Sequence, residues 1–248
     1  RMALWTYDFH PGNGLYTSMN AIRRDEEMDN LHSIYVDQWD WEKVIDEGTR
    51  NLDYLKTVVK VIVLTVCETL DKLKVRYPQI KTRLEKEVNF ITTQELEDLY
   101  PDKTPKEREN AYLRRHHTAF IMQIGDKLRS GERHDGRAPD YDDWKLNGDL
   151  LFYNDVLDCA FELSSMGIRV DPASLDEQLT KSYCDDRREL EFHRMLLEGK
   201  LPLTMGGGIG QSRLCMLMLG KAHIGEVQVS LWDEDTVRIC RENGIQLL

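Results

Sequence analysis

The order of strand-like and helix-like segments is the feature that most constrains the fold of this chain. Runs rich in β-branched and aromatic residues are mixed with helix-period runs, without the strict strand–helix–strand rhythm of a parallel sheet. The predicted strands are Leu15–Ile22, Leu31–Trp39, Ala119–Ile124, Leu150–Tyr153, Cys159–Met166 and Val227–Trp232. Parallel neighbours need a long crossover, usually a helix, whereas strands close in sequence favour antiparallel pairing. The pattern therefore predicts an α+β fold, an antiparallel β-sheet flanked by helices.

The clearest helical pattern follows the first two predicted strands. Apolar residues at Leu52, Leu55, Val59 and Ile62 recur every three or four positions, which places them on one side of a helix. The predicted helices are Glu42–Val75, a segment beginning at Thr92, Pro105–Arg115, Asp185–Leu197, Gln211–Leu219 and Asp233–Glu242. The chain has no internal repeat, and we expect a single domain over residues 1–248.

The charge balance narrows the possible partners. Lys and Arg number 33 against 44 Asp and Glu, which gives a net charge of −11. Nucleic-acid-binding proteins normally present a basic face, so a long contact with DNA or RNA is not expected. No apolar run approaches the roughly 18 residues of a membrane-spanning helix, so no membrane contact is expected. The five cysteines are widely spread and never form a C-x-x-C pair, which is typical of a reducing compartment and predicts a cytoplasmic location.

A glycine run, Gly206–Gly210 with only Ile209 interrupting it, leads directly into the helical segment that contains Arg213. Glycine lets a backbone approach a ligand closely, and a helix N-terminus attracts anions. The run is not the dinucleotide-binding fingerprint, which would need glycine at position 211, and Gly220-Lys221 does not complete a phosphate-binding P-loop. A tight strand-to-helix turn would explain one or two of these glycines but not four. We therefore expect the run to contact a ligand.

Several charged side chains interrupt strand-like or apolar segments. Arg23 leaves a predicted strand and could clamp a phosphate, although a solvated salt bridge in a loop is the simpler alternative. Glu162 lies within an apolar stretch and should be paired or metal-bound, because burying a lone carboxylate is costly. Arg169 has similar apolar neighbours, and an internal salt bridge with Glu162 or residues near it would satisfy its charge.

An acidic cluster precedes Glu162 and comprises Asp140, Asp142, Asp143 and Asp149. Two carboxylates on neighbouring strands can hold Mg²⁺ together with substrate phosphates, since this ion takes oxygen ligands and keeps several waters. A solvated acidic loop is the default interpretation for Asp140 and Asp143. The sequence thus points to Mg²⁺ most strongly where an acidic residue lies inside a strand.

Polar residues also interrupt the predicted strand around position 38. Either Asp37, or Gln38 together with Asp40, must face inward if this strand is half buried, because side chains alternate along a strand. Gln38 and Asp40 share one face, so a binding site could use both. The sequence alone leaves the two arrangements open.

Four segments in combination resemble the asparagine synthetase A (aspartate–ammonia ligase) family. They are Leu31–Glu42, Arg137–Trp144, Phe161–Val170 and Gly206–Leu214. The likeness extends over residues 1–248 and is weakest through the long helix and residues 85–108. The family's catalytic domain is similar to that of class II aminoacyl-tRNA synthetases, an antiparallel sheet flanked by helices. In that comparison the strands around Arg23 look like the second signature motif of the class, and the glycine run ending at Arg213 looks like the third.

The resemblance implies an ATP-dependent ligase that makes L-asparagine from L-aspartate and ammonia through β-aspartyl-AMP, with release of AMP and pyrophosphate. Arg23 would hold the α-phosphate, Arg213 would stack on adenine, and Asp149 and Glu162 would carry Mg²⁺. The implied ATP-binding residues are Arg23, His32, Asp149, Glu162, Gly208 and Arg213. The implied L-aspartate-binding residues are Gln38, Asp40, Asp142, Ser165 and Arg169. The implied catalytic residues are Arg23, Asp142 and Arg213, and a homodimer is expected from the family.

Two other functions stay open on the sequence. An aspartyl- or asparaginyl-tRNA synthetase-like enzyme would share the fold. The third motif, however, has Gln211-Ser212 where an acid usually precedes the arginine, which favours the ligase. A non-catalytic paralogue that senses amino acids is the second alternative, and the presence of the ATP-contacting residues argues against it.

Family members also have an N-terminal segment before the position that matches Arg1, and a longer loop where Trp144-Lys145-Leu146 stands here. The resemblance therefore implies a single adenylate-forming catalytic domain, residues 1–248, that lacks this segment and this internal loop.

Overall fold

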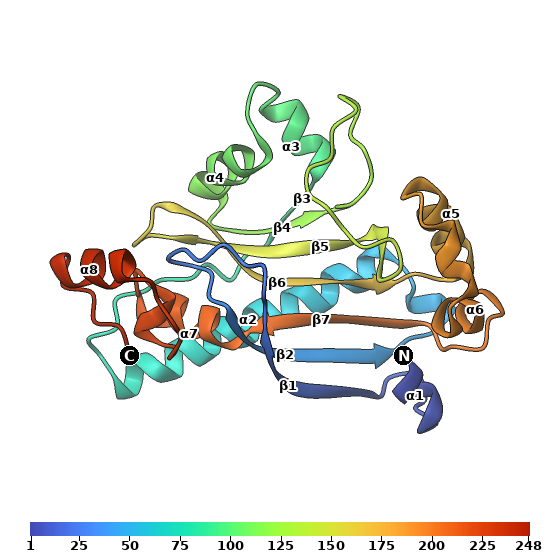
Figure 1. Cartoon of the computed structure of the whole chain (residues 1–248), viewed down its shortest axis with the longest axis horizontal. Helices are drawn as coiled ribbons and strands as arrows, with labels where there is room; N and C mark the ends of the chain where they lie inside the picture. The colour runs from blue at the N-terminus through green and yellow to red at the C-terminus, as the bar shows by residue number, and fades with distance from the viewer.

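The computed structural model describes residues 1–248, and its centre is a seven-stranded sheet with the order β1-β2-β7-β6-β5-β4-β3 (Figure 1). The strands are β1 (Gly14–Ile22), β2 (Tyr35–Val44), β3 (Asn89–Thr92), β4 (Thr118–Met122), β5 (Asp142–Asn154), β6 (Cys159–Arg169) and β7 (Thr204–Gly210). Neighbouring strands are antiparallel except β3 and β4, which run parallel at one edge. The predicted α+β fold with an antiparallel sheet is therefore confirmed.

Helices cover parts of both faces of this sheet. They are α1 (Met2–Thr6), α2 (Leu52–Arg76), α3 (Thr93–Leu99), α4 (Pro105–His116), α5 (Pro172–Lys181), α6 (Glu191–Leu197), α7 (Gln211–Leu219) and α8 (Glu234–Glu242). Three short 3₁₀ turns complete the chain: η1 (Glu47–Thr49), η2 (Asp185–Glu189) and η3 (Ile224–Glu226). None of the helices is both long and apolar enough to span a membrane.

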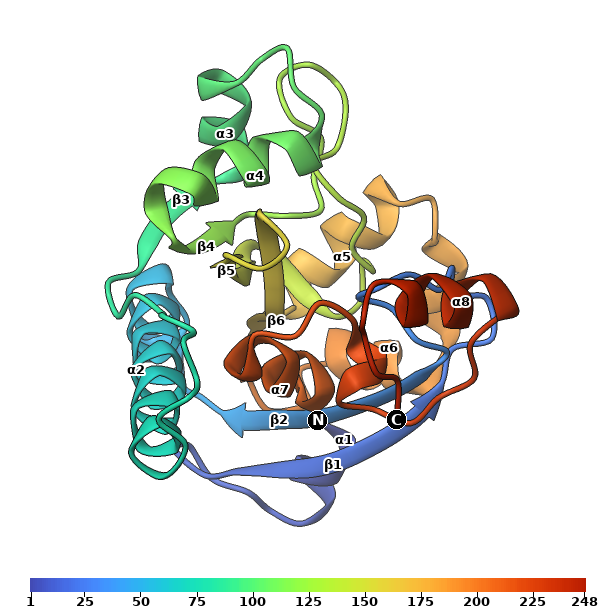
Figure 2. The same cartoon turned by 90° about the vertical axis from the view of Figure 1, so that its left-hand side faces the viewer.

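The long helix α2 lies along one face of the sheet (Figure 2). It begins at Leu52 because the side chain of Asn51 accepts a hydrogen bond from the backbone N–H of Tyr54. Its Val59 and other buried apolar residues pack against Phe120 and Phe152 of the sheet, and the buried methionines of α7 join the same core. This apolar cluster is the largest hydrophobic core of the molecule.

The opposite face is covered only in part. Helices α3 and α4 pack over β3, β4 and β5, where Leu113 contacts a small core with Ile121 and Leu151. Along β5, Leu150 points into the α2 core and Leu151 points towards α4, as alternation in a strand requires. Over β2, β7 and β6 the same face carries polar side chains, which line a cavity.

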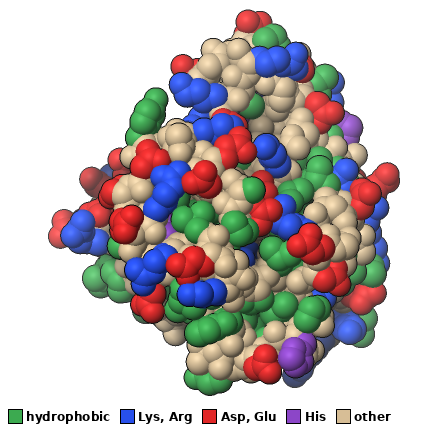
Figure 3. All heavy atoms as spheres, turned by 90° about the vertical axis from the view of Figure 1, so that its right-hand side faces the viewer, with side chains coloured by type: hydrophobic (Ala, Val, Ile, Leu, Met, Phe, Trp, Pro, Cys, Tyr) green, Lys and Arg blue, Asp and Glu red, His purple; other side chains and the backbone are tan.

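Helices α5 and α6 form a third apolar cluster at the end of the sheet, where Leu175, Leu179 and Leu196 surround Val170. Figure 3 shows this end of the molecule, with acidic and basic side chains interspersed over it and apolar side chains between them. The mixture of charges at this end offers no basic surface of the kind that nucleic acids bind.

One predicted strand is wrong. Residues 227–232 form an irregular connection between η3 and α8 instead of pairing with the sheet. Their side chains are held by other contacts: Gln228 is buried beside the N-terminus of α7, and Trp232 packs edge-on against His223 with ring centroids 4.7 Å apart. The alternating Val229 and Leu231 are 71% and 73% exposed, so the strand-like pattern of this segment does not reflect burial in the sheet.

Several predicted boundaries also need correction. The prediction of a helix from Glu42 is wrong at its start, because β2 continues to Val44 and α2 begins at Leu52. The predicted helix 185–197 is divided into η2 and α6. Strand β3 and helix α5 were not predicted, and β5 extends 13 residues from Asp142, so that it includes Asp143, which was interpreted as part of a loop.

Candidate active site

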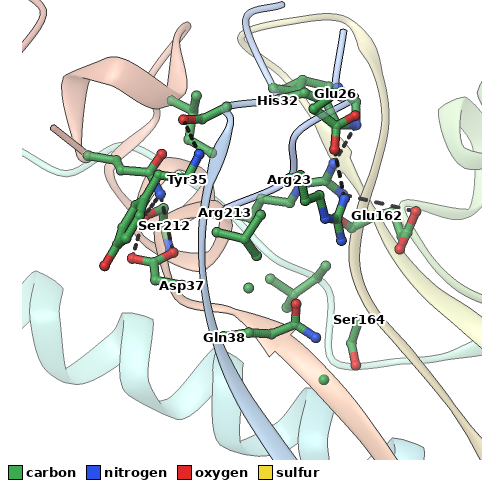
Figure 4. A pocket seen from close by; sticks show the side chains of 18 of the residues that line it. Arg23, Glu26, His32, Tyr35, Asp37, Gln38, Glu162, Ser164, Ser212 and Arg213 are labelled. Atoms are coloured by element: carbon green, nitrogen blue, oxygen red, sulfur yellow. Dashed lines mark hydrogen bonds and ion pairs between the residues drawn. The ribbon is translucent and has the colours of Figure 1, made fainter. Parts of the chain in front are cut away.

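A cavity of about 260 Å³ lies on the open face of the sheet, between the β1–β2 connection and the strands β6 and β7 (Figure 4). Among the predicted site residues, those that line it are Arg23, His32, Gln38, Glu162, Ser165, Gly208 and Arg213. Asp40 and Arg169 line a second cavity of about 250 Å³ together with Glu42 and Tyr141. Residues from four separate parts of the sequence thus meet on one face of the sheet.

Arg213 lies in the first turn of α7 and is held from two sides. Its Nη1 donates to the backbone carbonyl of Glu162 at 3.1 Å and lies 4.0 Å from Oε2 of the same residue. Its Nη2 donates to Nε2 of His32 at 2.7 Å. Because a guanidinium only donates, His32 Nε2 must accept, and Nδ1 carries the proton that bonds Asp29 at 2.8 Å. Asp29 and His32 therefore fix the position of Arg213.

Arg23 directly follows the last residue of β1 and lines the same cavity as Arg213. Its backbone N–H donates to the carbonyl of Ile34 at 2.7 Å, which continues the β1–β2 pairing by one residue. Its side chain is about half exposed and pairs with Glu26 at 2.9 Å. The salt bridge expected as the simpler alternative is therefore present, and the guanidinium still lines the cavity.

The glycine run lies within strand β7, which leads directly into α7 at Gln211. In the register, Gly208 lies opposite Asp40 of β2 and Ser165 of β6. A Cβ atom at Gly208 would overlap the side-chain amide of Gln38 and lie 2.6 Å from Asp40 Oδ1. The glycine therefore leaves room for these two side chains to lie flat across β7, where Gln38 Nε2 donates to Asp40 Oδ1 at 2.9 Å.

Asp37 points away from Gln38 and stabilises the start of α7. Its Oδ1 accepts from the backbone N–H of Ser212 at 3.0 Å and its Oδ2 from the Ser212 hydroxyl at 2.7 Å. The hydroxyl also accepts from Gln228 at 2.9 Å. Of the two arrangements left open by the sequence, Asp37 therefore caps the helix that carries Arg213, while Gln38 and Asp40 together face the cavities.

Arg169 is almost completely buried and is held by two carboxylates. Its Nη1 donates to Asp142, and its Nε donates to Glu42 Oε2 at 2.9 Å. Its guanidinium also lies 3.9 Å from the ring centroid of Tyr141. Burial lowers the pKa of Arg169, but the two carboxylates outweigh it and raise the pKa above its usual range. The expected internal salt bridge exists, with Asp142 and Glu42 and not with Glu162.

Asp149 is buried on β5 and pairs with Arg137 from the preceding connection. Burial, together with the nearby charge of Glu162, raises the pKa of Asp149 to about 7. One of its carboxylate oxygens, Oδ1, is buried and has no hydrogen-bond partner. Asp149 lies opposite Ser165 in the β5–β6 register, so this unsatisfied oxygen belongs to the same face as the cavity.

The residues that sequence reasoning missed are mostly partners of the residues it found. Glu42 orients Arg169, Arg137 neutralises Asp149, and Glu26 pairs with Arg23. Glu42 and Arg137 lie inside the segments that carry the family resemblance, which was the available signal for them. Nothing in the sequence connects either one with its partner, because the pairs form only when distant strands become neighbours.

The fold assigns the chain to a structural class of catalytic domain. Solved structures with this fold include an aspartyl-tRNA synthetase from Entamoeba histolytica, with a TM-score of 0.66 and 17% identity over 94% of this chain. An asparaginyl-tRNA synthetase from Pyrococcus horikoshii complexed with asparaginyl-adenylate has a TM-score of 0.62 and 16% identity over 90% of this chain. The chain spans about half the length of these two proteins, 50% and 53%. The catalytic fold is that of class II aminoacyl-tRNA synthetases.

Comparison with sequence families is more specific. The model of the aspartate–ammonia ligase family, AsnA, matches residues 1–244. The chain is 62% identical over its full length to an aspartate–ammonia ligase of Clostridium perfringens (strain 13 / Type A), of which it covers 74%. It is 60% identical to the enzyme of the same name from Clostridium tetani, of which it covers 73%. The chain belongs to the aspartate–ammonia ligase family, whose members join aspartate and ammonia to make asparagine.

Proposed function

We propose that this chain makes L-asparagine by activating L-aspartate with ATP, through a β-aspartyl-AMP intermediate. A side-chain carboxylate oxygen of aspartate attacks the α-phosphorus of ATP, and pyrophosphate leaves. Ammonia then attacks the acyl carbon of the mixed anhydride, AMP leaves, and the nitrogen loses a proton. The observation that carries the proposal is the cavity lined by Arg23, Arg213 and Gln38, where Gln38 bonds Asp40 of the neighbouring cavity.

ATP would occupy the cavity that Arg23 and Arg213 line. Arg23 would contact the α-phosphate, because its guanidinium is exposed on the cavity wall and is paired with only one carboxylate. Arg213 would lie against the adenine and near the phosphates, held by His32. Gly208 would let Gln38 lie flat along the floor of the cavity, which leaves the space above it to the nucleotide. Fixed cations at the point where negative charge develops stabilise a transition state without reorganisation.

Mg²⁺ fits the pair Asp149 and Glu162. The unsatisfied buried oxygen of Asp149 supplies one ligand, and Glu162 on the neighbouring strand supplies another. No cluster of three metal-ligating side chains exists here. This donor set suits Mg²⁺, which is commonly held by one or two carboxylates with phosphate oxygens and waters. When bound, the ion would neutralise charge on the ATP phosphates as pyrophosphate leaves.

L-Aspartate would lie between the two cavities. Arg169 is oriented by Asp142 and Glu42, and its bonds to them and to Tyr141 do not use all five N–H donors of a guanidinium. A donor is left for a substrate carboxylate. Gln38, Asp40 and Ser165 would contact the remaining polar atoms of aspartate. No protein nucleophile is required, because the acyl-adenylate is already activated and correct positioning supplies the remaining rate enhancement.

A homodimer and a cytoplasmic location are further parts of the proposal. Strand β1 is one of the two edge strands of the sheet, and Tyr16 and Ile22 on this strand are well exposed, as is Trp39 on β2. An exposed sheet edge with apolar side chains is a surface that a second subunit could cover. Light scattering tests the dimer, and a monomer at micromolar concentration would contradict it.

All five cysteines are free, which suits a reducing compartment and therefore the proposed cytoplasmic location.

The test is a product assay with purified protein, L-aspartate, ATP, Mg²⁺ and ammonium, in the presence and absence of tRNA. We expect AMP, pyrophosphate and asparagine in equal amounts, with no requirement for tRNA. Heavy oxygen placed in the β-carboxylate of aspartate should appear in the phosphate of AMP. ADP as the product would overturn the proposal, and AMP formation that depends on tRNA would favour the synthetase-like alternative.

A further inference from the structure

A cluster of three ionisable side chains lies on and beside α4, outside the residues assigned so far. Lys106 Nζ pairs with Glu109 Oε2 at 2.9 Å, and Glu109 Oε1 contacts His134 Nε2 at 3.0 Å. The His134 side chain is 2% exposed and that of Glu109 13%, whereas that of Lys106 is 66% exposed. A buried pair therefore holds an exposed ammonium group in place. A surface lysine paired with solvent-exposed partners would not be constrained in this way.

The helix places Lys106 beside the candidate active site. Asn110 lies one turn after Lys106, on the same side of α4, and its Oδ1 accepts a hydrogen bond from the backbone N–H of Ala160 at 2.7 Å. Ala160 is two residues before Glu162 on β6, and side chains two residues apart share a face of the sheet. Figure 2 shows α4 lying across the β5 and β6 side of the molecule.

Electrostatic coupling agrees with this placement. Loss of hydration near the protein lowers the pKa of Lys106, and Glu109 outweighs that effect, so the pKa is raised overall. Two charges of the candidate site also act on it: Glu162 raises the pKa and Arg213 lowers it. The ammonium therefore lies within the field of Glu162 and Arg213, which both line the cavity.

We propose that Lys106 binds the β- and γ-phosphates of ATP and the pyrophosphate that leaves, and that Glu109 and His134 are positioning residues for it. This proposal rests on the proposed function. Lysine acts as a compact charge towards phosphates, and an ammonium paired with one carboxylate retains N–H donors for a second anion. The site needs such a cation: Asp149 and Glu162 add negative charge near a polyanionic substrate, and Arg23 and Arg213 are assigned to the nucleotide end.

The first test is Lys106→Ala, compared with Lys103→Ala, an exposed lysine three residues earlier. We expect the KM for ATP and the inhibition constant of pyrophosphate to rise about 10- to 100-fold in Lys106→Ala, which corresponds to the loss of a charge-assisted hydrogen bond. The inhibition constant of AMP should change less than twofold, because AMP lacks the β- and γ-phosphates. Lys103→Ala should match the original protein in all three constants.

The second test separates positioning from folding. Glu109→Gln should raise the inhibition constant of pyrophosphate and leave that of AMP unchanged, and it should add little to Lys106→Ala in the double variant. If Glu109→Gln fails to fold, Lys106→Met alone decides the matter, since its side chain is exposed. An unchanged pyrophosphate constant in Lys106→Ala would overturn the inference. Failure of the proposed function is distinguishable, because the original protein would then form no AMP at all.

Discussion

At the scale of single residues, the site depends on pairs of side chains that the sequence keeps far apart. Arg169 is useful only because Glu42 and Asp142 hold it, and Asp149 is tolerated in the interior because Arg137 pairs with it. The identities of most site residues could be predicted from motifs, whereas these partnerships could not. They arise only in the folded sheet, which brings Glu42 into contact with Arg169, 127 positions later, and Asp142 with Arg169, 27 positions later.

Gly208→Ala tests the floor of the cavity. The added methyl group would displace the amide of Gln38 and crowd Asp40. We expect activity to fall about 10- to 100-fold, and the unfolding free energy to fall by roughly 1–3 kcal/mol, the typical cost of overpacking. Gly136→Ala is the matched control, since a Cβ there meets no atom within 4 Å. Equal activity in the two variants would contradict the assigned role of Gly208.

Asp149→Asn tests the raised pKa of this carboxyl group. The pKa of Asp149 is about 7 in the folded chain, above the ordinary aspartate value of 3.8, so between pH 4 and 7 the folded state binds more protons than the unfolded state. Stability contributed by this group is therefore present at acidic pH and is lost as the pH rises through 7. In metal-free protein, the unfolding free energy of Asp149→Asn relative to the original should rise by about 2–4 kcal/mol from pH 4.5 to 7.5. Denaturant titrations at both pH values measure this, and exposed Asp155→Asn should show no such trend.

At the scale of secondary-structure elements, the helix and strand types were predicted well and their ends poorly. The central strands and α2 have strong periodic patterns, whereas β3 has four residues and α5 is a short helix whose N-cap, Asp171, bonds Ser174. The glycine run shows the limit most clearly. Glycine is disfavoured in strands by its conformational entropy, and the neighbouring strands explain its presence in β7: a Cβ would meet Gln38 of β2 at Gly208 and Met166 of β6 at Gly207.

Asp37→Ala tests the connection between helix capping and the site. It removes two hydrogen bonds to Ser212, so we expect a loss of about 1–2 kcal/mol in unfolding free energy. It should also raise the KM for ATP about tenfold, because the first turn of α7 carries Arg213. Asp233→Ala removes the equivalent cap of α8, where Asp233 accepts from Thr236 at 2.9 Å. It should cost similar stability and leave the KM unchanged; a matching rise in KM would show that stability alone explains the effect.

At the scale of the whole molecule, the fold class followed from the sequence but the strand order did not. The last strand, β7, enters between β2 and β6, and this insertion brings Gly208 between Asp40 and Ser165. Local patterns predict strands, not their neighbours, so the cavity could be inferred only through the family resemblance. In this strand order β1 and β3 are the edge strands, and the polar face over β2, β7 and β6 remains open to substrate.

The melting temperature of the whole chain should rise when nucleotide substrates bind and should not change when tRNA is added. A ligand that binds only the folded state at 100 times its dissociation constant stabilises it by about 2.7 kcal/mol, which raises the melting temperature by roughly 5 °C in a chain of this size. We expect Mg²⁺-ATP to produce such a shift, AMP a smaller one, and Arg213→Ala to abolish most of both. The net charge of −11 opposes binding of tRNA, so tRNA at the same phosphate concentration should produce no shift. A salt-sensitive shift with tRNA would mean that a local basic surface outweighs the overall charge, and would return the tRNA synthetase-like function to consideration.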